Sequence, residues 1–151
     1  YNGECVKISS GYVVGGNGSA ADILGVLNGI FYNDASTLKP TFANFYKATI
    51  TPANSEDTTA FVIDDPFQLY VVAADAATGV ATFLETYDMN TSAGSDTTGK
   101  SSSTLDIGTT SQDGKQFRML RSAEDPENED ATAVRHSVIV VSNLNSFNGH
   151  N

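Results

Sequence analysis

The sequence TAFVIDDPFQLYVV, residues 59–72, decides the fold class of this chain. Its first part, Thr59–Ile63, is rich in β-branched and aromatic residues, which predicts a strand. Pro66 restricts the residue before it to an extended conformation and ends the strand there. The second part, 67–72, alternates polar and apolar residues, as a strand with one buried face does. Short strands separated by turns are typical of all-β proteins.

Comparable runs occur elsewhere in the chain. Residues 5–10 alternate, and 11–14 follow after a glycine, so these two runs predict an antiparallel pair. The alternation of 115–121 also predicts a strand, and 105–107 forms a short one. The apolar, β-branched segment 134–141 is typical of a central strand with both faces covered.

The segment 19–32 fits two conformations. Its apolar residues have helical spacing, with Ser19 as a possible cap, but Gly25 and Gly29 would each cost a helix about 1 kcal/mol. The part 24–32 also fits a buried strand with a bulge at a glycine. We favour the strand.

Other segments remain open at this stage. Residues 80–87 fit a strand or a helix, and 89–104 fit a polar loop or a flat strand. The aromatic cluster at 42–46 is expected on a loop or short helix, and Thr49-Ile50 could begin a short strand. The chain therefore contains six to nine short strands and little helix, which predicts a mainly antiparallel small β-barrel or β-sandwich with long loops.

Length and composition agree with one domain over 1–151. The chain has 151 residues and a mass of 15.9 kDa, and 56 residues are Gly, Ser, Thr or Asn. Charged residues make up only 17%, which suits β structure with ordered loops better than a helical bundle. The segment 143–151 reads as a polar tail. Tyr1 stands in what already resembles a strand, so we expect an N-terminal arm before it.

Charge and cysteine content exclude several classes of function. The net charge of −10 argues against binding to nucleic acid, which needs cationic surface to displace counterions, and against anionic membrane surfaces. Cys5 is the only cysteine, so neither a disulfide framework within one chain nor a cysteine-rich zinc site can form. No apolar run is long enough to span a bilayer.

Residues 94–101, GSDTTGKS, match the phosphate-loop pattern G-x-x-x-x-G-K-S. A working phosphate loop needs a buried strand before its first glycine and a helix beginning at its lysine. Here polar residues precede Gly94, and 102–108 is a poor helix former. Asp96 would also place a carboxylate against the phosphate. The sequence therefore favours a polar loop.

The other motifs are weaker. Gly16-x-Gly18-x-x-Ala21 imitates a dinucleotide-binding turn, but the following segment carries two glycines, so a hairpin turn is favoured. Asp64 and Asp65 could serve as general acid and base, although an Asx-type turn before Pro66 is the better interpretation. The loop EDPENED, 124–130, lacks the regular spacing and glycine turn of a calcium loop and is expected to be a solvated acidic face.

His136 lies in a predicted strand and His150 in the tail, so they do not form a metal motif. A lone histidine in a strand is usually a structural residue. Cys5 lies far from both in sequence. We therefore predict no catalytic set, no metal site and no cofactor.

Several blocks of the chain resemble a family of small head proteins of tailed bacteriophages that are encoded near the major coat protein. The blocks follow one another in the family's order over most of the chain. Gly99-Lys100-Ser101 falls where that family has a polar β segment. The matching blocks are Tyr1–Lys7, Ile23–Tyr32, Pro40–Tyr46, Phe61–Pro66, Thr98–Ser101 and Asp125–Glu129.

The resemblance implies a non-enzymatic decoration or cement protein on the outer surface of a phage head. Its partner would be the major capsid protein, and it would form a homo-oligomer, for which a trimer is the first expectation. The alternatives are a secreted or surface carbohydrate-binding module, which the absence of Trp disfavours, and another β-rich virion part such as a collar, tail or fibre. Aromatic anchors at the interface, most of which we expect to be core, are Phe42, Phe45, Tyr46, Phe67 and Tyr70.

Overall fold

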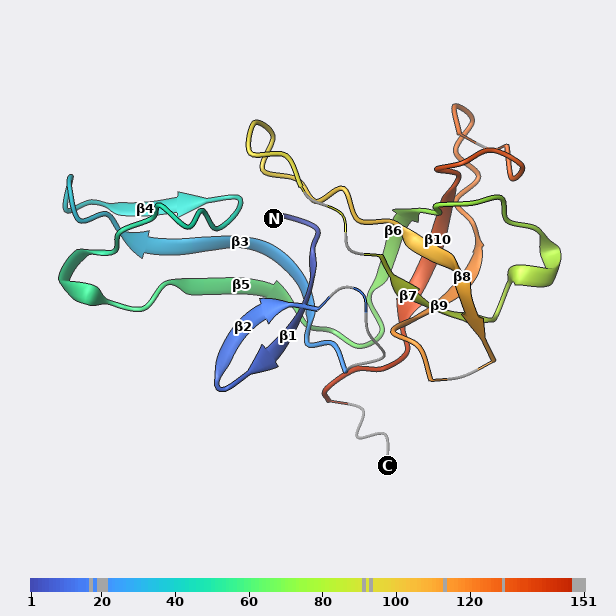
Figure 1. The fold of residues 1–151 in the computed structure, drawn as a ribbon, viewed down its shortest axis with the longest axis horizontal. Helices are drawn as coiled ribbons and strands as arrows, with labels where there is room; N and C mark the ends of the chain where they lie inside the picture. Colours follow the sequence, from blue (N-terminus) through green and yellow to red (C-terminus); the bar gives the residue numbers. More distant parts are fainter. Residues whose placement is uncertain are drawn as a thin grey trace.

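The structure, a computed structural model, describes residues 1–16, 18, 22–90, 92, 94–112, 114–128 and 130–147. Ten strands in two antiparallel sheets and two short 3-10 helices make up its regular structure (Figure 1). The all-β prediction is confirmed. In the described part of the chain the strand order of neither sheet closes on itself, so the sheets are open rather than a closed barrel.

The first sheet is built around β3 (Gly25–Asn33), its longest strand. On one side β3 pairs first with β1 and then with β4, and on the other side it pairs with β5. The hairpin of β1 and β2 turns through Ser10 and Gly11, which both have positive φ, as a two-residue hairpin requires. The other strands of this sheet are β1 (Cys5–Ser9), β2 (Tyr12–Gly15), β4 (Pro40–Ala43) and β5 (Thr59–Ile63).

The second sheet has the strand order β6-β10-β9-β7-β8. As predicted for the valine-rich segment, β10 is an interior strand, paired with β6 and β9 on its two sides. The strands are β6 (Leu69–Ala73), β7 (Thr86–Met89), β8 (Leu105–Ser111), β9 (Phe117–Ser122) and β10 (Ser137–Ser142).

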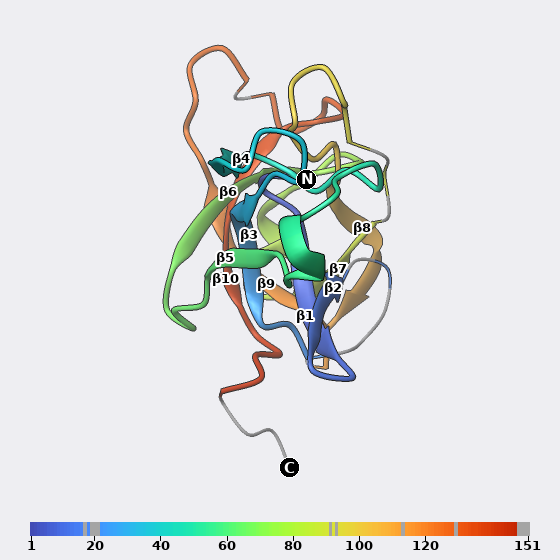
Figure 2. The same ribbon diagram turned by 90° about the vertical axis from the view of Figure 1, so that its left-hand side faces the viewer.

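The second sheet forms a lobe, and β3, β4 and β5 extend away from it as an arm (Figure 1). Figure 2 shows the arm end-on, with the lobe behind it. The main core lies in the lobe, around the buried side chains of Tyr87, Leu105, Met119 and Val138. Cys5 of β1 and Ile23, which precedes β3, belong to the same core, so the base of the arm is anchored by apolar packing.

The segment 64–68 carries the chain from one sheet to the other. The two strongest strand predictions, β5 and β6, therefore lie in different sheets and do not pair. The Asp65 carboxylate accepts the backbone N–H of Phe67 at 2.9 Å, which is the predicted Asx-type turn.

The predicted glycine bulge of β3 is confirmed. The pairing of β3 with β5 shifts register between Leu27 and Ile30, and Gly29 has a φ of +126°. Before the bulge Val26 shares a face with Ile63, and after it Phe31 shares that face with Thr59. The extra residue thus keeps apolar side chains on both faces of the arm.

Some local predictions were wrong. Phe42 lies on a strand, β4, rather than on a loop or helix, because Pro40–Ala43 pairs with the far end of β3. Thr49 and Ile50 form no strand and belong to the loop after β4. The segment 80–87 divides into a 3-10 helix, Val80–Thr82, and the beginning of β7.

The polar segment after β10 belongs to the fold as far as residue 147. Asn145 is buried and bridges to Ile23, and the Ile23 N–H donates to the Leu144 carbonyl at 3.0 Å. The predicted tail residues 148–151 lie outside the described residues.

Candidate functional site

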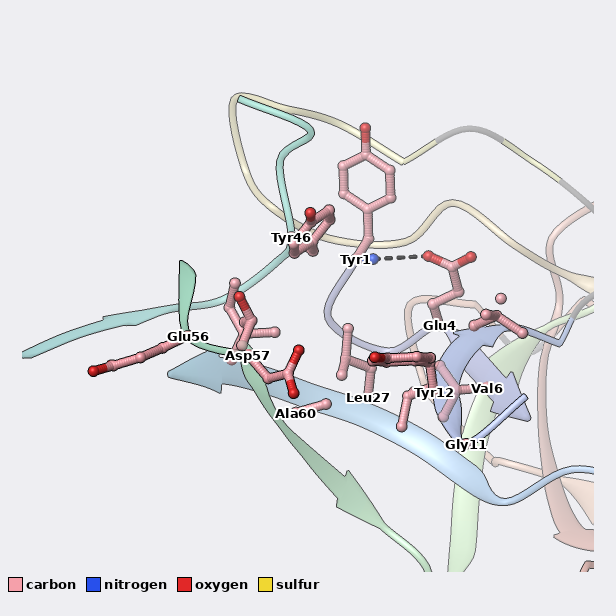
Figure 3. A pocket seen from close by; sticks show the side chains of 15 residues that line it. Tyr1, Glu4, Val6, Gly11, Tyr12, Leu27, Tyr46, Glu56, Asp57 and Ala60 are labelled. Atoms are coloured by element: carbon pink, nitrogen blue, oxygen red, sulfur yellow. Dashed lines mark hydrogen bonds and ion pairs between the residues drawn. The ribbon is translucent and has the colours of Figure 1, made fainter. Parts of the chain in front are cut away.

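A groove of about 790 Å³ runs along one face of the first sheet (Figure 3). Its floor is apolar: Val6 of β1, Leu27 and Ile30 of β3, and Ala60 of β5 all line it. These side chains lie on the same face because Leu27 pairs with Val62 and Ile30 with Ala60 across the bulge. Val6, Leu27 and Ile30 form a second, small core cluster, which the loop after β4 covers in part through Ile50.

Carboxylates and tyrosine rings border the groove. Glu56 and Asp57 are exposed on one side, and Glu4 lies on the other, where its carboxylate accepts a hydrogen bond from the amino group of Tyr1 at 2.7 Å (Figure 3). Tyr12 and Tyr46 are 64% and 56% exposed. The lining contains no Lys, Arg or His, and its Tyr1 amino group is paired with Glu4, so Glu56 and Asp57 give the groove a net negative charge.

One wall of the groove is the β2 strand. Residues 11–15 all line it, although the side chains of a strand point alternately to opposite faces. The groove is thus lined by Gly11 of the turn and by the whole length of β2. Among the described residues β2 pairs only with β1, so its second edge is not paired with another described strand.

The opposite face of the arm carries a continuous apolar surface, here called the outer face and made of Phe31, Phe42, Phe61 and Ile63. Phe31 lies directly opposite Phe42, and the rings of Phe42 and Phe61 are 5.8 Å apart between centroids. All four side chains are between 37% and 58% exposed. Toward the lobe the same sheet face becomes core, because Cys5, which pairs with Val26, is buried there.

The five aromatic residues nominated as interface anchors occupy different surroundings. Phe42 lies on the outer face, Tyr46 borders the groove, and Phe67 is 80% exposed at the crossover between the sheets. Phe45 is half-buried and stacks on Tyr1 with ring centroids 5.3 Å apart. Tyr70 packs against the lobe core, edge-on to Phe117.

The phosphate-loop look-alike folds as a tight polar loop. The Gly99 N–H donates to the Ser95 carbonyl at 2.7 Å, and Lys100 bridges to Asn2 rather than beginning a helix. Its two glycines lie against aromatic rings, which leave no space for a side chain at either position. A Cβ on Gly94 would lie 2.3 Å from the Tyr1 ring, and one on Gly99 would lie 2.6 Å from the Phe45 ring. The motif therefore has a packing role.

The other nominated residues do not assemble into a catalytic set. Asp64 and Asp65 are exposed at the crossover and do not line the groove. Cys5 is buried in the lobe core, away from solvent. Of the dinucleotide-like motif, residues 17 and 19–21 lie outside the described residues, as do Glu129 and His150.

His136 is buried and holds the acidic loop in place. Its Nδ1 lies 3.0 Å from the Asn128 carbonyl, and the Asn128 amide donates to the Arg135 carbonyl at 2.6 Å. Asp125 and Asp130 each accept a backbone N–H two residues ahead. Their carboxylates thus shape turns of the loop. Within the described ranges, no three His, Cys, Asp or Glu residues gather as a metal site.

Sequence reasoning missed Phe31, Phe61 and Ile63, together with the groove carboxylates Glu56 and Asp57. One signal was present in Thr59–Ile63, because Ala60 and Val62 alternate with Phe61 and Ile63 and both sets are apolar. Such a strand needs cover on both faces. The arm itself supplies cover on one face only.

Comparisons of the chain with protein-family models, curated proteins and solved structures found no match. Among the described residues, no helix is both long and apolar enough to cross a membrane.

Proposed function

We propose that this chain is a non-enzymatic decoration or cement protein, which binds the outer surface of a tailed-phage head and stabilises the coat lattice. The observation that carries the proposal is the outer face of the arm. It continues a sheet face that is core at the base of the arm, and it leaves two phenylalanine rings more than 40% exposed at its far end.

Much apolar surface is exposed. Among the described residues, seventeen large hydrophobic side chains are exposed and fourteen hydrophobic residues are buried in the core. Scattered exposed residues are normal, but a contiguous apolar patch marks a contact surface. A projecting arm with such a patch suits a protein that bridges neighbouring subunits, including copies of itself in a homo-oligomer. The order of sequence blocks shared with small phage head proteins supports the same role.

Binding only to an assembled lattice stabilises that lattice by mass action, and many weak contacts add through avidity. The net charge of −10 favours the exterior of a shell over its DNA-filled interior, because like charges repel.

Quantitative mass spectrometry of purified virus particles tests the role. A ratio near one copy per coat subunit is expected for a protein that covers the shell. A few per cent would assign the chain to a collar, tail or fibre, and absence from particles would contradict the proposal.

The outer face is tested by adding variants to shells stripped of the protein. Phe42→Ser and Phe61→Ser should each reduce occupancy, whereas Val80→Ser should not, although Val80 is 85% exposed elsewhere. Equal occupancy for all three would remove the outer face from the interface.

A second candidate is a carbohydrate-binding module, favoured by the tyrosine rings and carboxylates that border the groove. Tyrosine rings can stack on sugars, and carboxylates can accept hydrogen bonds from sugar hydroxyls. A glycan array distinguishes the two, since specific binding by the wild type and its loss in Tyr12→Ala would favour this candidate.

A further inference from the structure

We propose that the groove binds an extended, aliphatic segment of a protein partner that carries lysine or arginine side chains. The identity of the partner rests on the proposed function: for a decoration protein, the partner is the coat protein. The shape, the charge and the edge strand of the groove each contribute to the inference.

The charge of the groove selects a cation. Its lining holds Glu4, Glu56 and Asp57, and its one cationic group, the Tyr1 amino group, is paired with Glu4, so the lining has a net negative charge. Asp57 lies beside the floor, whereas the Glu56 side chain extends away from it and accepts a hydrogen bond from the Asn33 amide at 2.9 Å (Figure 3). The exposed rings of Tyr12 and Tyr46 also attract cations through their π faces.

The floor of the groove selects aliphatic side chains. Val6, Leu27 and Ile30 lie at the bottom of the groove with little of their surface exposed, and the half-buried Ala60 completes this apolar floor. A segment that alternates aliphatic and basic residues would place one set on this floor and the other set toward the rim, because strand side chains alternate between two faces.

The β2 edge selects an extended backbone. β2 lines the groove over its whole length, and in the described residues it pairs with β1 alone, so one of its edges is open to a further strand. A strand of the partner can form backbone hydrogen bonds with such an edge, while pockets beside the edge bind the partner's side chains.

Titration by NMR tests the inference with defined probes: a blocked peptide of alternating valine and lysine, and its counterpart of valine and glutamate. The basic peptide should shift the amide signals of Gly11, Gly15 and Thr58, and the acidic peptide should not. Raising the salt concentration should weaken the binding.

A matched pair of variants locates the charge effect. Glu56→Gln combined with Asp57→Asn should weaken the basic peptide about fivefold, since each exposed ion pair contributes little. Glu124→Gln combined with Glu127→Gln removes the same charge from the acidic loop and should leave the affinity unchanged.

Several outcomes would overturn the inference. One is that millimolar basic peptide does not shift the amide signals of the groove. The others are that both peptides shift these signals equally, or that both pairs of substitutions weaken peptide binding equally. Groove shifts that grow with protein concentration alone would assign the groove to a second copy, and shifts with an oligosaccharide would assign it to a sugar.

The peptide titration is independent of the particle assay. If the chain is absent from virus particles but binds the basic peptide in the groove, the decoration role fails and the groove inference stands. If the chain covers particles but the groove does not bind the peptide, the decoration role stands and the groove inference fails.

Discussion

The ring of Phe42 on β4 lies over the backbone of Gly29 on β3. A Cβ on Gly29 would lie only 2.5 Å from Cζ of Phe42 and 3.1 Å from the Ala43 carbonyl oxygen. Because Gly29 has no side chain, the ring reaches across the central strand to Phe61 on β5. This one glycine therefore makes the outer face continuous across three strands.

Gly29→Ala should destabilise the protein. Its φ of +126° disfavours any side chain, and the added methyl group must displace the Phe42 ring. We expect a loss of about 1–3 kcal/mol in the free energy of unfolding, measured in urea. Gly79→Ala is the control, since nothing lies within 4 Å of its Cβ position. Equal stability of the two variants would contradict the packing described.

The phosphate-loop look-alike should respond to its glycine and not to its lysine. Gly94→Ala must move the Tyr1 ring and also meets the Lys100 carbonyl at 2.7 Å, so its melting temperature should fall. Lys100→Ala should leave the melting temperature nearly unchanged, with or without Mg-ATP. A nucleotide-dependent rise in the wild type that disappears in Lys100→Ala would restore the nucleotide hypothesis.

The pair of Lys115 and Asp88 should stabilise the lobe. The Lys115 ammonium lies 2.9 Å from the Asp88 carboxylate, whose residue is 6% exposed on β7. Lys115→Met leaves that carboxylate without its cation, and we expect a loss of about 1–3 kcal/mol. Adding Asp88→Asn to the same chain should recover part of the loss. If the double variant is as unstable as the sum of the two single variants, the pair is not coupled.

Stability should fall in alkaline solution. Burial, with a smaller contribution from the Glu4 carboxylate, raises the pKa of the Cys5 thiol from its ordinary 9.0 to about 12. The unfolded chain therefore loses this proton first, so the stability present below about pH 9 declines as the pH rises toward 12. Burial raises the pKa of Tyr70 to about 12 and acts in the same direction.

Urea unfolding at several pH values measures this dependence, and Cys5→Val should make it shallower. Because the native thiol stays protonated and buried, Cys5 should react with a disulfide reagent near pH 8 only after unfolding. Fast reaction of the native protein would contradict the burial of Cys5.

Local patterns predicted most strands because alternation and turn residues can be read within a single segment. The strand at 59–63, the hairpin of β1 and β2 and the bulge in β3 were readable in this way, and the strand predicted at 115–121 lies at Phe117–Ser122. Pro40–Ala43 was not, because its pairing partner on β3 lies elsewhere in the sequence and the segment itself lacks alternation.

The candidate sites were harder to predict, since each combines residues from distant segments. The groove combines Glu4 of the N-terminal segment on one side with Asp57 of the loop before β5 on the other, and neither residue belongs to a motif. The expectation that most of the nominated aromatic residues are core was wrong, because Phe42, Tyr46 and Phe67 are exposed and only Tyr70 packs against the lobe core. Strand pairing and the packing of the loops decide which of the other nominated aromatic residues lie on the surface.

The all-β class, the hairpin, the bulge and the acidic charge follow from the amino-acid sequence alone, because alternation, turn residues and composition are properties of local segments. That β5 and β6 lie in different sheets, and that the arm leaves one apolar face uncovered, follows from the packing of the whole chain. The physical reason is that burial is a property of the whole assembly. Ala60 and Phe61 are neighbours in one apolar strand, and only the packing of the other strands and loops makes one of them floor and the other exposed surface.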